Sequence, residues 1–402
     1  MTHILYLAHD LSDAAVRRRV MMLTAGGARV TVAGFQRAGN VFVEDREIPL
    51  IVLGRTADAR LGQRVAAVFA AANSLKRKLA QVARPDVIVA RNLEMLALAG
   101  RASTLYGEEV PIAYECLDIH RLLLDEGAKG RLLRWAEGHF GRKARLLLTS
   151  SPAFVEHYFQ PRSRLSLPTL LLENKVFSLH DTTTEGPVRP PLPRSGEPWR
   201  IGWFGAIRCR KSLDMLAEFA ARMEGRVEIV LRGRPAYSEF EDFDEQVKRA
   251  PHVEFRGAYR NPEDLAEIYS DVHFVWAIDF FEEGLNSEWL LPNRLYEGSL
   301  HGAVPIGRAS TETGRFLERT GVGLVLENVT VHDLVSAFGE MDADHYQTLT
   351  QRLDAKDKSH WVTGRKDCEA LVQQLAALGH TARSTTPLAV PPSRVLEAHH
   401  DR

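Results

Sequence analysis

Short apolar runs alternate with amphipathic segments along most of the chain, and this alternation predicts the elements of an α/β protein. In the first half, the expected strands cover residues 4–7, 29–35, 48–53, 86–90, 110–115, 146–149 and 170–172. The expected helices between them cover residues 13–25, 61–82, 94–103 and 129–144. Continuous apolar strands separated by helices indicate a parallel sheet covered on both faces.

The same alternation restarts after residues 181–198 (DTTTEGPVRPPLPRSGEP), which are rich in Pro, Thr, Gly and Ser and read as a linker. The expected strands of the second half cover residues 200–204, 227–231, 253–256, 272–278, 304–306 and 322–326. Its expected helices cover residues 212–223, 240–250, 262–269, 293–301, 312–319, 331–341, 343–354 and 360–378, with Asn261 as the cap of the third.

These elements predict two Rossmann-like, doubly wound parallel-sheet domains, which also suits a length of 402 residues. We expect an N-terminal domain at 1–178, a Pro-rich linker at 179–198 and a C-terminal domain at 199–357. A C-terminal helix at 358–380 is a candidate to cross back to the N-terminal domain, and the tail at 381–402 is expected to be disordered. Ligands of open α/β sheets bind at the carboxyl ends of the strands, so we expect both edges to face one cleft.

Composition and charge narrow the class of protein. The 45% apolar and 26% charged residues are globular values. The three cysteines are widely spaced, which favours reduced thiols of a cytoplasmic protein, and neither a signal peptide nor a membrane span is predicted. Residues 1–180 hold 25 Lys+Arg against 17 Asp+Glu, so the N-terminal half suits an anionic partner. Anionic lipid or a lipid-linked pyrophosphate is expected and nucleic acid is not, because aromatic residues do not alternate with the cations.

The segment 290–307 (LLPNRLYEGSLHGAVPIG) carries the clearest chemical pattern. A loop with Asn293 and Arg294 leads into a short helix that carries Glu297. A carboxylate near a helix start, at a sheet crevice, can accept hydrogen bonds from two vicinal hydroxyls of a ribose. Backbone N–H groups of the loop and helix N-terminus can bind a diphosphate. The segment therefore predicts a site for a nucleotide-activated donor.

A second segment, 202–211 (GWFGAIRCRK), suits a pyrophosphate. We expect its strand to end at Phe204, so that Gly205 permits close backbone approach and Arg208 and Lys211 stand before a helix. Arg232 and Gly233 follow the next expected strand and are further candidates for the nucleotide.

Two more strand ends add candidate contacts to the same site. Residues 256–260 (RGAYR) are a candidate wall for the base. Residues 279–284 (DFFEEG) form an acidic, aromatic loop whose oxygens are candidates for sugar hydroxyls.

Candidate catalytic groups lie in the first half. The segment 114–121 (YECLDIHR) places Asp118 and His120 just after a strand, and Asp10 follows the first strand. A carboxylate or imidazole at this edge can act as general base on an acceptor hydroxyl. Asp118 is our first choice, with His120 and Asp10 as alternatives.

Two helical patterns of the first half are candidates for a membrane surface. Residues 61–82 combine an apolar face with a Lys-Arg-Lys cluster at 76–78, and residues 129–145 mix six cations with Leu, Trp and Phe. Interfacial helices bind anionic lipid in this way. A buried apolar stripe with a polar outer face explains the same pattern, and the sequence alone leaves both open.

Four segments resemble the GT-B glycosyltransferases of the group 1, family 4-like kind, and among them the bacterial exopolysaccharide (succinoglycan-type) glucosyltransferases. They are 114–120 (YECLDIH), 148–154 (LTSSPAF), 202–211 (GWFGAIRCRK) and 291–306 (LPNRLYEGSLHGAVPI). The resemblance implies that the N-terminal domain at 1–178 binds the acceptor and that the C-terminal domain at 199–357 binds the nucleotide-sugar donor. It also implies that Glu297 binds the ribose and that Arg208 and Lys211 bind the diphosphate. The family's Glu-x7-Glu pair would put its first Glu at Trp289, so retaining and inverting chemistry both stay open.

The resemblance implies transfer of a hexose, glucose from UDP-glucose first, to a polyprenyl-pyrophosphate-linked oligosaccharide. The reaction would take place at the cytoplasmic face of the inner membrane, on which the protein is peripheral. No Asp-x-Asp motif stands at a suitable strand end, so we expect neither a metal nor another cofactor. The alternatives are a non-hydrolysing nucleotide-sugar epimerase and a non-catalytic sugar-nucleotide-binding subunit of a polysaccharide complex. Donor sugar, acceptor, linkage and oligomeric state are not determined by the sequence.

Overall fold

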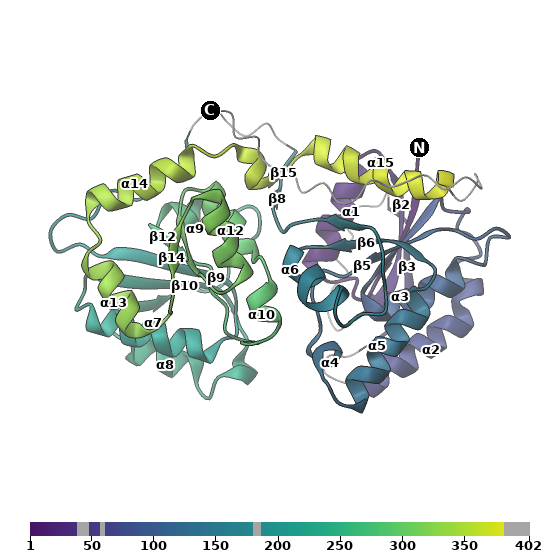
Figure 1. The fold of residues 1–402 in the computed structure, drawn as a ribbon, viewed down its shortest axis with the longest axis horizontal. Helices are drawn as coiled ribbons and strands as arrows, with labels where there is room; N and C mark the ends of the chain where they lie inside the picture. The colour runs from purple at the N-terminus through teal and green to yellow at the C-terminus, as the bar shows by residue number, and fades with distance from the viewer. Residues whose placement is uncertain (38–47, 57–60, 180–185, 382–402) are drawn as a thin grey trace. The chain divides into compact units, whose positions relative to one another are not determined.

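The computed structural model describes residues 1–37, 48–56, 61–179 and 186–381, and these form two compact units (Figure 1). The N-terminal unit comprises residues 1–150, 155–172 and, at its C-terminal end, the helix Arg365–Thr381. The C-terminal unit comprises Ser151–Phe154 and Glu173–Gly364. It begins before the expected boundary at residue 178, because β8 (Val176–Phe177) pairs with β15 (Val362–Thr363).

The N-terminal unit is built on a seven-stranded sheet of order β3-β2-β1-β4-β5-β6-β7, in which all neighbours are parallel. Its strands are β1 (His3–Ala8), β2 (Arg29–Gln36), β3 (Leu50–Arg55), β4 (Val87–Arg91), β5 (Ile112–Glu115), β6 (Ala144–Thr149) and β7 (Thr169–Leu171). Strands β1, β4 and β5 are buried at every position, which explains their unbroken apolar runs.

Helices cover both faces of this sheet. They are α1 (Ala14–Ala25), α2 (Leu61–Lys78), α3 (Asn92–Ala102), α4 (Arg121–Leu124), α5 (Ala128–Gly141) and α15 (Arg365–Thr381). From β1 the strand order runs toward one edge of the sheet, and from β4 it runs toward the other edge. Because the crossovers between parallel strands are right-handed, α1 lies on one face of the sheet and α2, α3 and α5 lie on the other face. Helix α15 packs on α1, as Figure 1 shows, and the backbone of Gly26 touches Cys368 of α15.

The C-terminal unit is built on a six-stranded parallel sheet of order β11-β10-β9-β12-β13-β14. Its strands are β9 (Trp199–Ile207), β10 (Val227–Pro235), β11 (Val253–Phe255), β12 (Phe274–Trp276), β13 (Val304–Arg308) and β14 (Leu324–Leu326). Because the sheet is parallel, the carboxyl ends of β9, β12 and β13 meet at one edge as neighbours.

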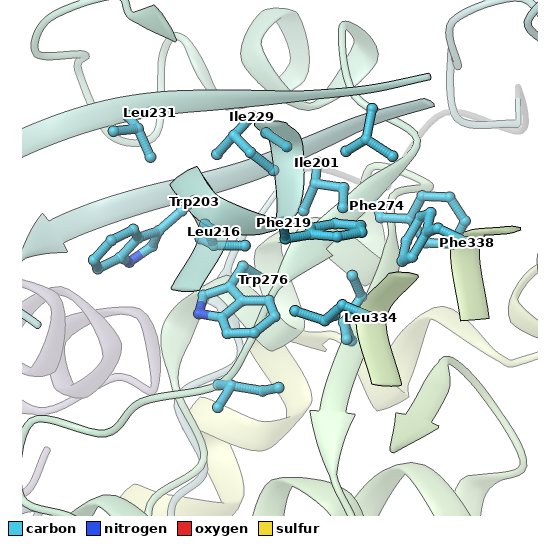
Figure 2. Packing of buried hydrophobic residues seen from close by; sticks show 14 of the residues in the cluster. Ile201, Trp203, Leu216, Phe219, Ile229, Leu231, Phe274, Trp276, Leu334 and Phe338 are labelled. Carbon is cyan, nitrogen blue, oxygen red and sulfur yellow. The ribbon is translucent and has the colours of Figure 1, made fainter. Parts of the chain in front are cut away.

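The helices of this unit are α6 (Pro152–Phe154), α7 (Arg210–Arg222), α8 (Phe243–Arg249), α9 (Leu265–Ser270), α10 (Asn286–Trp289), α11 (Asn293–Leu300), α12 (Glu312–Thr320), α13 (Val331–Gly339) and α14 (Ala343–Asp354). Figure 2 shows the core between the sheet and the helices α7 and α13, where Phe338 packs against Phe219 and Phe274, and Trp276 belongs to the same cluster. This core fixes the strands whose ends carry the candidate donor residues.

The expected ends of β9 and β10 are wrong. Both strands continue to Ile207 and Pro235, and Gly205 and Gly233 are register partners inside the ladder. A Cβ on Gly233 would lie 1.9 Å from the carbonyl oxygen of Gly205, and φ is +136° at Gly233. Gly233 is therefore required by the close packing of two strands.

Candidate donor-binding site and candidate base

Glu297 lies on α11 with only 6% of its surface exposed, and both oxygens of its carboxylate are hydrogen-bonded. Asn261 donates from Nδ2 to Oε1 at 2.8 Å, and the hydroxyl of Tyr269 donates to Oε2 at 3.3 Å. Each oxygen of an ionised carboxylate can accept more than one hydrogen bond. The two donors therefore orient the carboxylate within the site.

This use of Asn261 corrects the sequence expectation. Helix α9 begins at Leu265 after Asp264, and Asn261 does not cap it. Its amide instead reaches Glu297, 36 positions along the chain. Asn261 and Tyr269 are members of the site that sequence reasoning missed as such, because only the tertiary fold brings them to Glu297.

Arg294 and Tyr259 connect Glu297 to the strand ends. The Nη2 of Arg294 donates to the carbonyl of Ile278 at 2.9 Å, and its Nε has no hydrogen-bond partner among the described residues. Burial lowers the pKa of Arg294, and the nearby Asp279 opposes this shift. Burial also raises the pKa of the Tyr259 phenol, and Glu297 adds to the effect while Arg294 opposes it. Tyr259 thus lies close enough to Glu297 and Arg294 for their charges to act on it, and Arg294 lies similarly close to Asp279.

Arg208 stands between β9 and α7 and faces the loop after β12. Its Nη2 is 3.6 Å from Oδ2 of Asp279, and its guanidinium carbon is 4.6 Å from the ring centre of Phe281. The Arg208 side chain is 40% exposed. It is thus a partly solvated cation at the strand edge, as binding of a phosphate requires.

Lys211, in the first turn of α7, has an equivalent environment. Its Nζ lies 2.6 Å from Oε2 of Glu283 and 4.5 Å from the ring centre of Phe280. Arg308, the last residue of β13, contacts Oε1 of the same Glu283 at 3.2 Å. The acidic loop 279–284 therefore faces the cations at this edge.

The remaining donor candidates lie around this centre. Arg232 on β10 is half-buried, its Nε has no hydrogen-bond partner among the described residues, and it acts electrostatically on Tyr259. It also lines a cavity of about 410 Å³ with residues of α9. Gly205 lies near Tyr259, since a Cβ there would be 3.9 Å from the phenolic oxygen. Asn293 begins α11 with an exposed side chain.

The three candidate bases lie at the carboxyl edge of the N-terminal sheet. Asp118 is exposed in the loop after β5. His120 caps α4, with Nδ1 accepting from the N–H of Leu122 at 3.2 Å, and burial followed by Arg64 lowers its pKa. Asp10 is engaged locally, because its Oδ1 accepts from the N–H and hydroxyl of Ser12 at 2.9 and 2.7 Å. Asp118 is therefore the carboxylate of this set that is most open to a substrate.

Glu115, which precedes Asp118, has a different environment. It is fully buried, and it accepts from the hydroxyl of Tyr6 and from Nε of Arg19, each at 2.5 Å. Arg91 contacts it at 3.4 Å. Burial acts against ionisation, but Arg19 and then Arg91 prevail and lower the pKa of Glu115. This cluster holds β1, α1, β4 and β5 together.

Across residues 1–37, 48–56, 61–179 and 186–381, none of the helices has the length and apolar character of a membrane span. Over the same residues, no group of three or more His, Cys, Asp or Glu side chains is arranged to hold a metal ion.

Comparison with known proteins identifies the class. A family model described as a glycosyl transferase 4-like domain matches residues 13–164. The chain is 57% identical over 391 residues to the succinoglycan biosynthesis protein ExoL of Rhizobium meliloti (strain 1021), and the match covers 96% of each chain. The chain therefore belongs to the same family as this relative, it carries a glycosyl transferase 4-like domain, and it is a glycosyltransferase.

Solved structures agree on the fold. Anabaena Alr3699/HepE in complex with UDP and glucose superposes with a TM-score of 0.63 at 16% identity, covering 96% of this chain and 99% of that one. The sucrose-phosphate synthase of Thermosynechococcus elongatus gives a TM-score of 0.67 at 14% identity, covering 95% and 98%. The expected GT-B fold, with two parallel-sheet α/β units, is confirmed.

Proposed function

We propose that the protein transfers a hexose, with glucose from UDP-glucose as the first choice, to a lipid-linked oligosaccharide in bacterial exopolysaccharide synthesis. The name of the relative in Rhizobium meliloti supports the pathway, since that protein acts in succinoglycan biosynthesis. The HepE structure in complex with UDP-glucose supports the donor class by analogy of fold. The acceptor in this proposal carries a polyprenyl pyrophosphate.

One observation carries the donor assignment. An oriented, buried carboxylate at Glu297 shares α11 with Arg294, and partly exposed cations stand at the ends of β9 and β13, on either side of β12. In the proposed complex Glu297 accepts hydrogen bonds from the ribose hydroxyls. Arg208 and Lys211 bind the diphosphate and stabilise the charge that develops as it departs. These cations supply the charge stabilisation that the reaction needs without a metal.

In the proposed reaction the N-terminal unit supplies the general base. Asp118 takes the proton from the attacking acceptor hydroxyl as the glycosidic bond forms, and the nucleoside diphosphate leaves. Exposure of Asp118 and the local engagement of Asp10 favour this order of candidates, with His120 second. Retention or inversion of the sugar stays open.

The proposed lipid acceptor suits the outer surface of α2 and α5. Phe69 and Val65 on α2 are 68% and 47% exposed, and Leu132 and Trp135 on α5 are 63% and 49% exposed. Apolar side chains therefore point outward from both helices, next to cations such as Lys76. These exposed apolar residues support an interfacial surface. We propose peripheral binding to an anionic membrane through this face.

Flotation with liposomes tests the membrane proposal. Wild-type protein should float with vesicles that contain anionic lipid, and Leu132→Ser with Trp135→Ser should reduce the floating fraction. Tyr237→Ser is the matched control, because Tyr237 is a 57% exposed aromatic residue of the C-terminal unit. Equal flotation with neutral and anionic vesicles would remove the proposal.

Turnover assays test the function. Purified protein, UDP-glucose and a membrane extract that holds lipid-linked acceptor should release UDP and label the lipid fraction. Asp118→Asn should lower turnover about 100-fold or more while UDP binding persists. UDP-sugar isomers formed without acceptor would favour the epimerase. Nucleotide binding without turnover on any acceptor would favour the non-catalytic subunit.

A further inference from the structure

The loop after β12 places one carboxylate between two cations at the carboxyl edge of the C-terminal sheet. Glu283 contacts Lys211 at 2.6 Å through Oε2 and Arg308 at 3.2 Å through Oε1. Lys211 belongs to the helix that follows β9, and Arg308 is the last residue of β13. Strands β9 and β13 lie on either side of β12, and a single anion bridges the two cations.

An aromatic residue of the same loop, Phe280, contacts both cations. The ring of Phe280 lies 4.5 Å from Nζ of Lys211 and 5.9 Å from the guanidinium carbon of Arg308. Phe280 is 6% exposed and belongs to the core of the unit, so its ring is a fixed support. Both cations therefore point toward one place, which Glu283 now fills.

The pairs are open to exchange with a ligand. The side chain of Glu283 is 38% exposed and that of Lys211 is 49% exposed. Ion pairs of this exposure contribute little to stability, because water and salt screen them. A diphosphate carries more charge and more oxygen acceptors than one carboxylate, so it can replace Glu283 on both cations.

We propose that Arg308 is a third cation of the donor-diphosphate site, beside Arg208 and Lys211, and that Glu283 occupies this site until the nucleotide displaces it. The inference rests on the proposed function. The sequence suggests that the acidic loop accepts hydrogen bonds from the sugar hydroxyls of the donor. The inference gives the loop the opposite role, because its carboxylate competes with the donor for the same cations. Nucleotide binding then includes release of the loop from Lys211 and Arg308.

Calorimetric titration of the full-length protein with UDP and with uridine tests the proposal. Glu283→Gln should bind UDP about threefold to tenfold more tightly than wild type, because the internal competitor has lost its charge. Arg308→Gln should bind UDP about tenfold more weakly. Uridine, which has no phosphate, should bind all three proteins alike.

Matched variants separate the proposal from general effects. Glu241→Gln removes the carboxylate that faces Arg210 at 3.3 Å, one residue from Lys211, and should leave UDP affinity unchanged. Arg308→Lys keeps the charge and should recover at least half of the affinity lost in Arg308→Gln. Equal losses in both Arg308 variants would indicate damage to β13 and overturn the assignment of Arg308.

Two further outcomes would overturn the inference. UDP affinity in Glu283→Gln that equals or falls below that of wild type would show that Glu283 does not compete with the nucleotide. A change of uridine affinity equal to that of UDP would show that the effect does not involve the phosphates. Titration with inorganic pyrophosphate keeps this test distinct from the donor proposal. One outcome is that wild type fails to bind UDP while Glu283→Gln binds pyrophosphate more tightly than wild type and Arg308→Gln binds it more weakly. In that case the proposed donor is wrong, and the assignment of Arg308 and Glu283 to a diphosphate site stands.

Discussion

Two glutamates, one in each unit, lie between two cations, and their burial separates their roles. Glu115 is fully buried between Arg19 and Arg91, and Tyr6 completes its hydrogen bonds. Glu283 has a side chain that is 38% exposed between Lys211 and Arg308. A buried cluster whose charges are all paired is costly to break, whereas a partly solvated pair exchanges partners easily. The comparison teaches that burial, more than composition, separates a structural charge cluster from a binding site.

The largest expected effect breaks the buried side of this comparison. Glu115→Gln should lower the free energy of unfolding by about 3–5 kcal/mol, because Arg19 loses its buried counter-charge and Arg91 keeps only Asp13, at 3.5 Å. Urea denaturation measures the change. Glu283→Gln is the control and should change the same quantity by less than about 1 kcal/mol. Similar losses in the two variants would contradict the distinction.

A buried histidine of the C-terminal unit extends the comparison to pH. His273 is 3% exposed, and its Nδ1 accepts from the N–H of Arg200 at 3.0 Å while Nε2 donates to the carbonyl of Pro191 at 3.1 Å. Burial lowers the pKa of His273 to about 4. The ring is therefore neutral in the folded protein, and the neutral tautomer satisfies both contacts.

Stability should consequently fall as pH falls through this window. The unfolded chain takes up a proton near pH 6.5, and the folded chain takes it up only near pH 4. Above pH 6.5 the neutral ring makes its full contribution to the free energy of unfolding, and about 3 kcal/mol of this contribution is lost by pH 4. Urea denaturation from pH 7 to pH 4 should show a shallower pH dependence in His273→Asn. Parallel curves for the two proteins would refute this account of His273.

Glu297 is buried like Glu115, and it accepts hydrogen bonds from two neutral side chains, those of Asn261 and Tyr269. Glu297→Ala should weaken UDP binding by roughly 1–3 kcal/mol, the scale of a lost hydrogen bond to a charged group. Calorimetry with UDP measures it. Glu312→Gln provides the control, since Glu312 is also buried but pairs with Arg315 and Arg319 on its own helix. Unchanged UDP affinity in Glu297→Ala would remove its proposed role on the ribose.

The smallest expected effect sharpens the exposed side of the comparison. A double-mutant cycle with Lys211→Met and Glu283→Gln should give a coupling of about 0.2–1 kcal/mol in the free energy of unfolding. The exposed pair of Arg210 and Glu241 should give a coupling in the same range. A coupling of several kcal/mol at Lys211 and Glu283 would mean that this pair is a structural cluster like that of Glu115.

The sequence predicts the fold well where pattern and burial agree. The parallel sheets and most helices follow from apolar runs and amphipathic spacing, and α1 covers Ala14–Ala25 where a helix over 13–25 is expected. The ends of β9 and β10 were predicted too early, because glycine usually interrupts a strand. Here Gly205 and Gly233 lie side by side in the ladder, and only their mutual packing explains both.

The candidate site could be predicted only in part for a related reason. Residue types and positions at strand ends indicated Glu297, Arg208 and Lys211 as donor-binding candidates, and these stay predictions about function. The sequence could not indicate which side chain would face which. The contact of Asn261 with Glu297 and that of Arg308 with Glu283 join segments that local propensity treats separately.

The central claim is that the carboxyl edge of the C-terminal sheet binds the donor nucleotide, and a crystal structure of the complex with UDP tests it most directly. We expect the ribose hydroxyls within hydrogen-bond distance of Glu297, the diphosphate on Arg208, Lys211 and Arg308, and Glu283 displaced. UDP bound away from Glu297, or a diphosphate that leaves Glu283 paired with Lys211 and Arg308, would contradict the account.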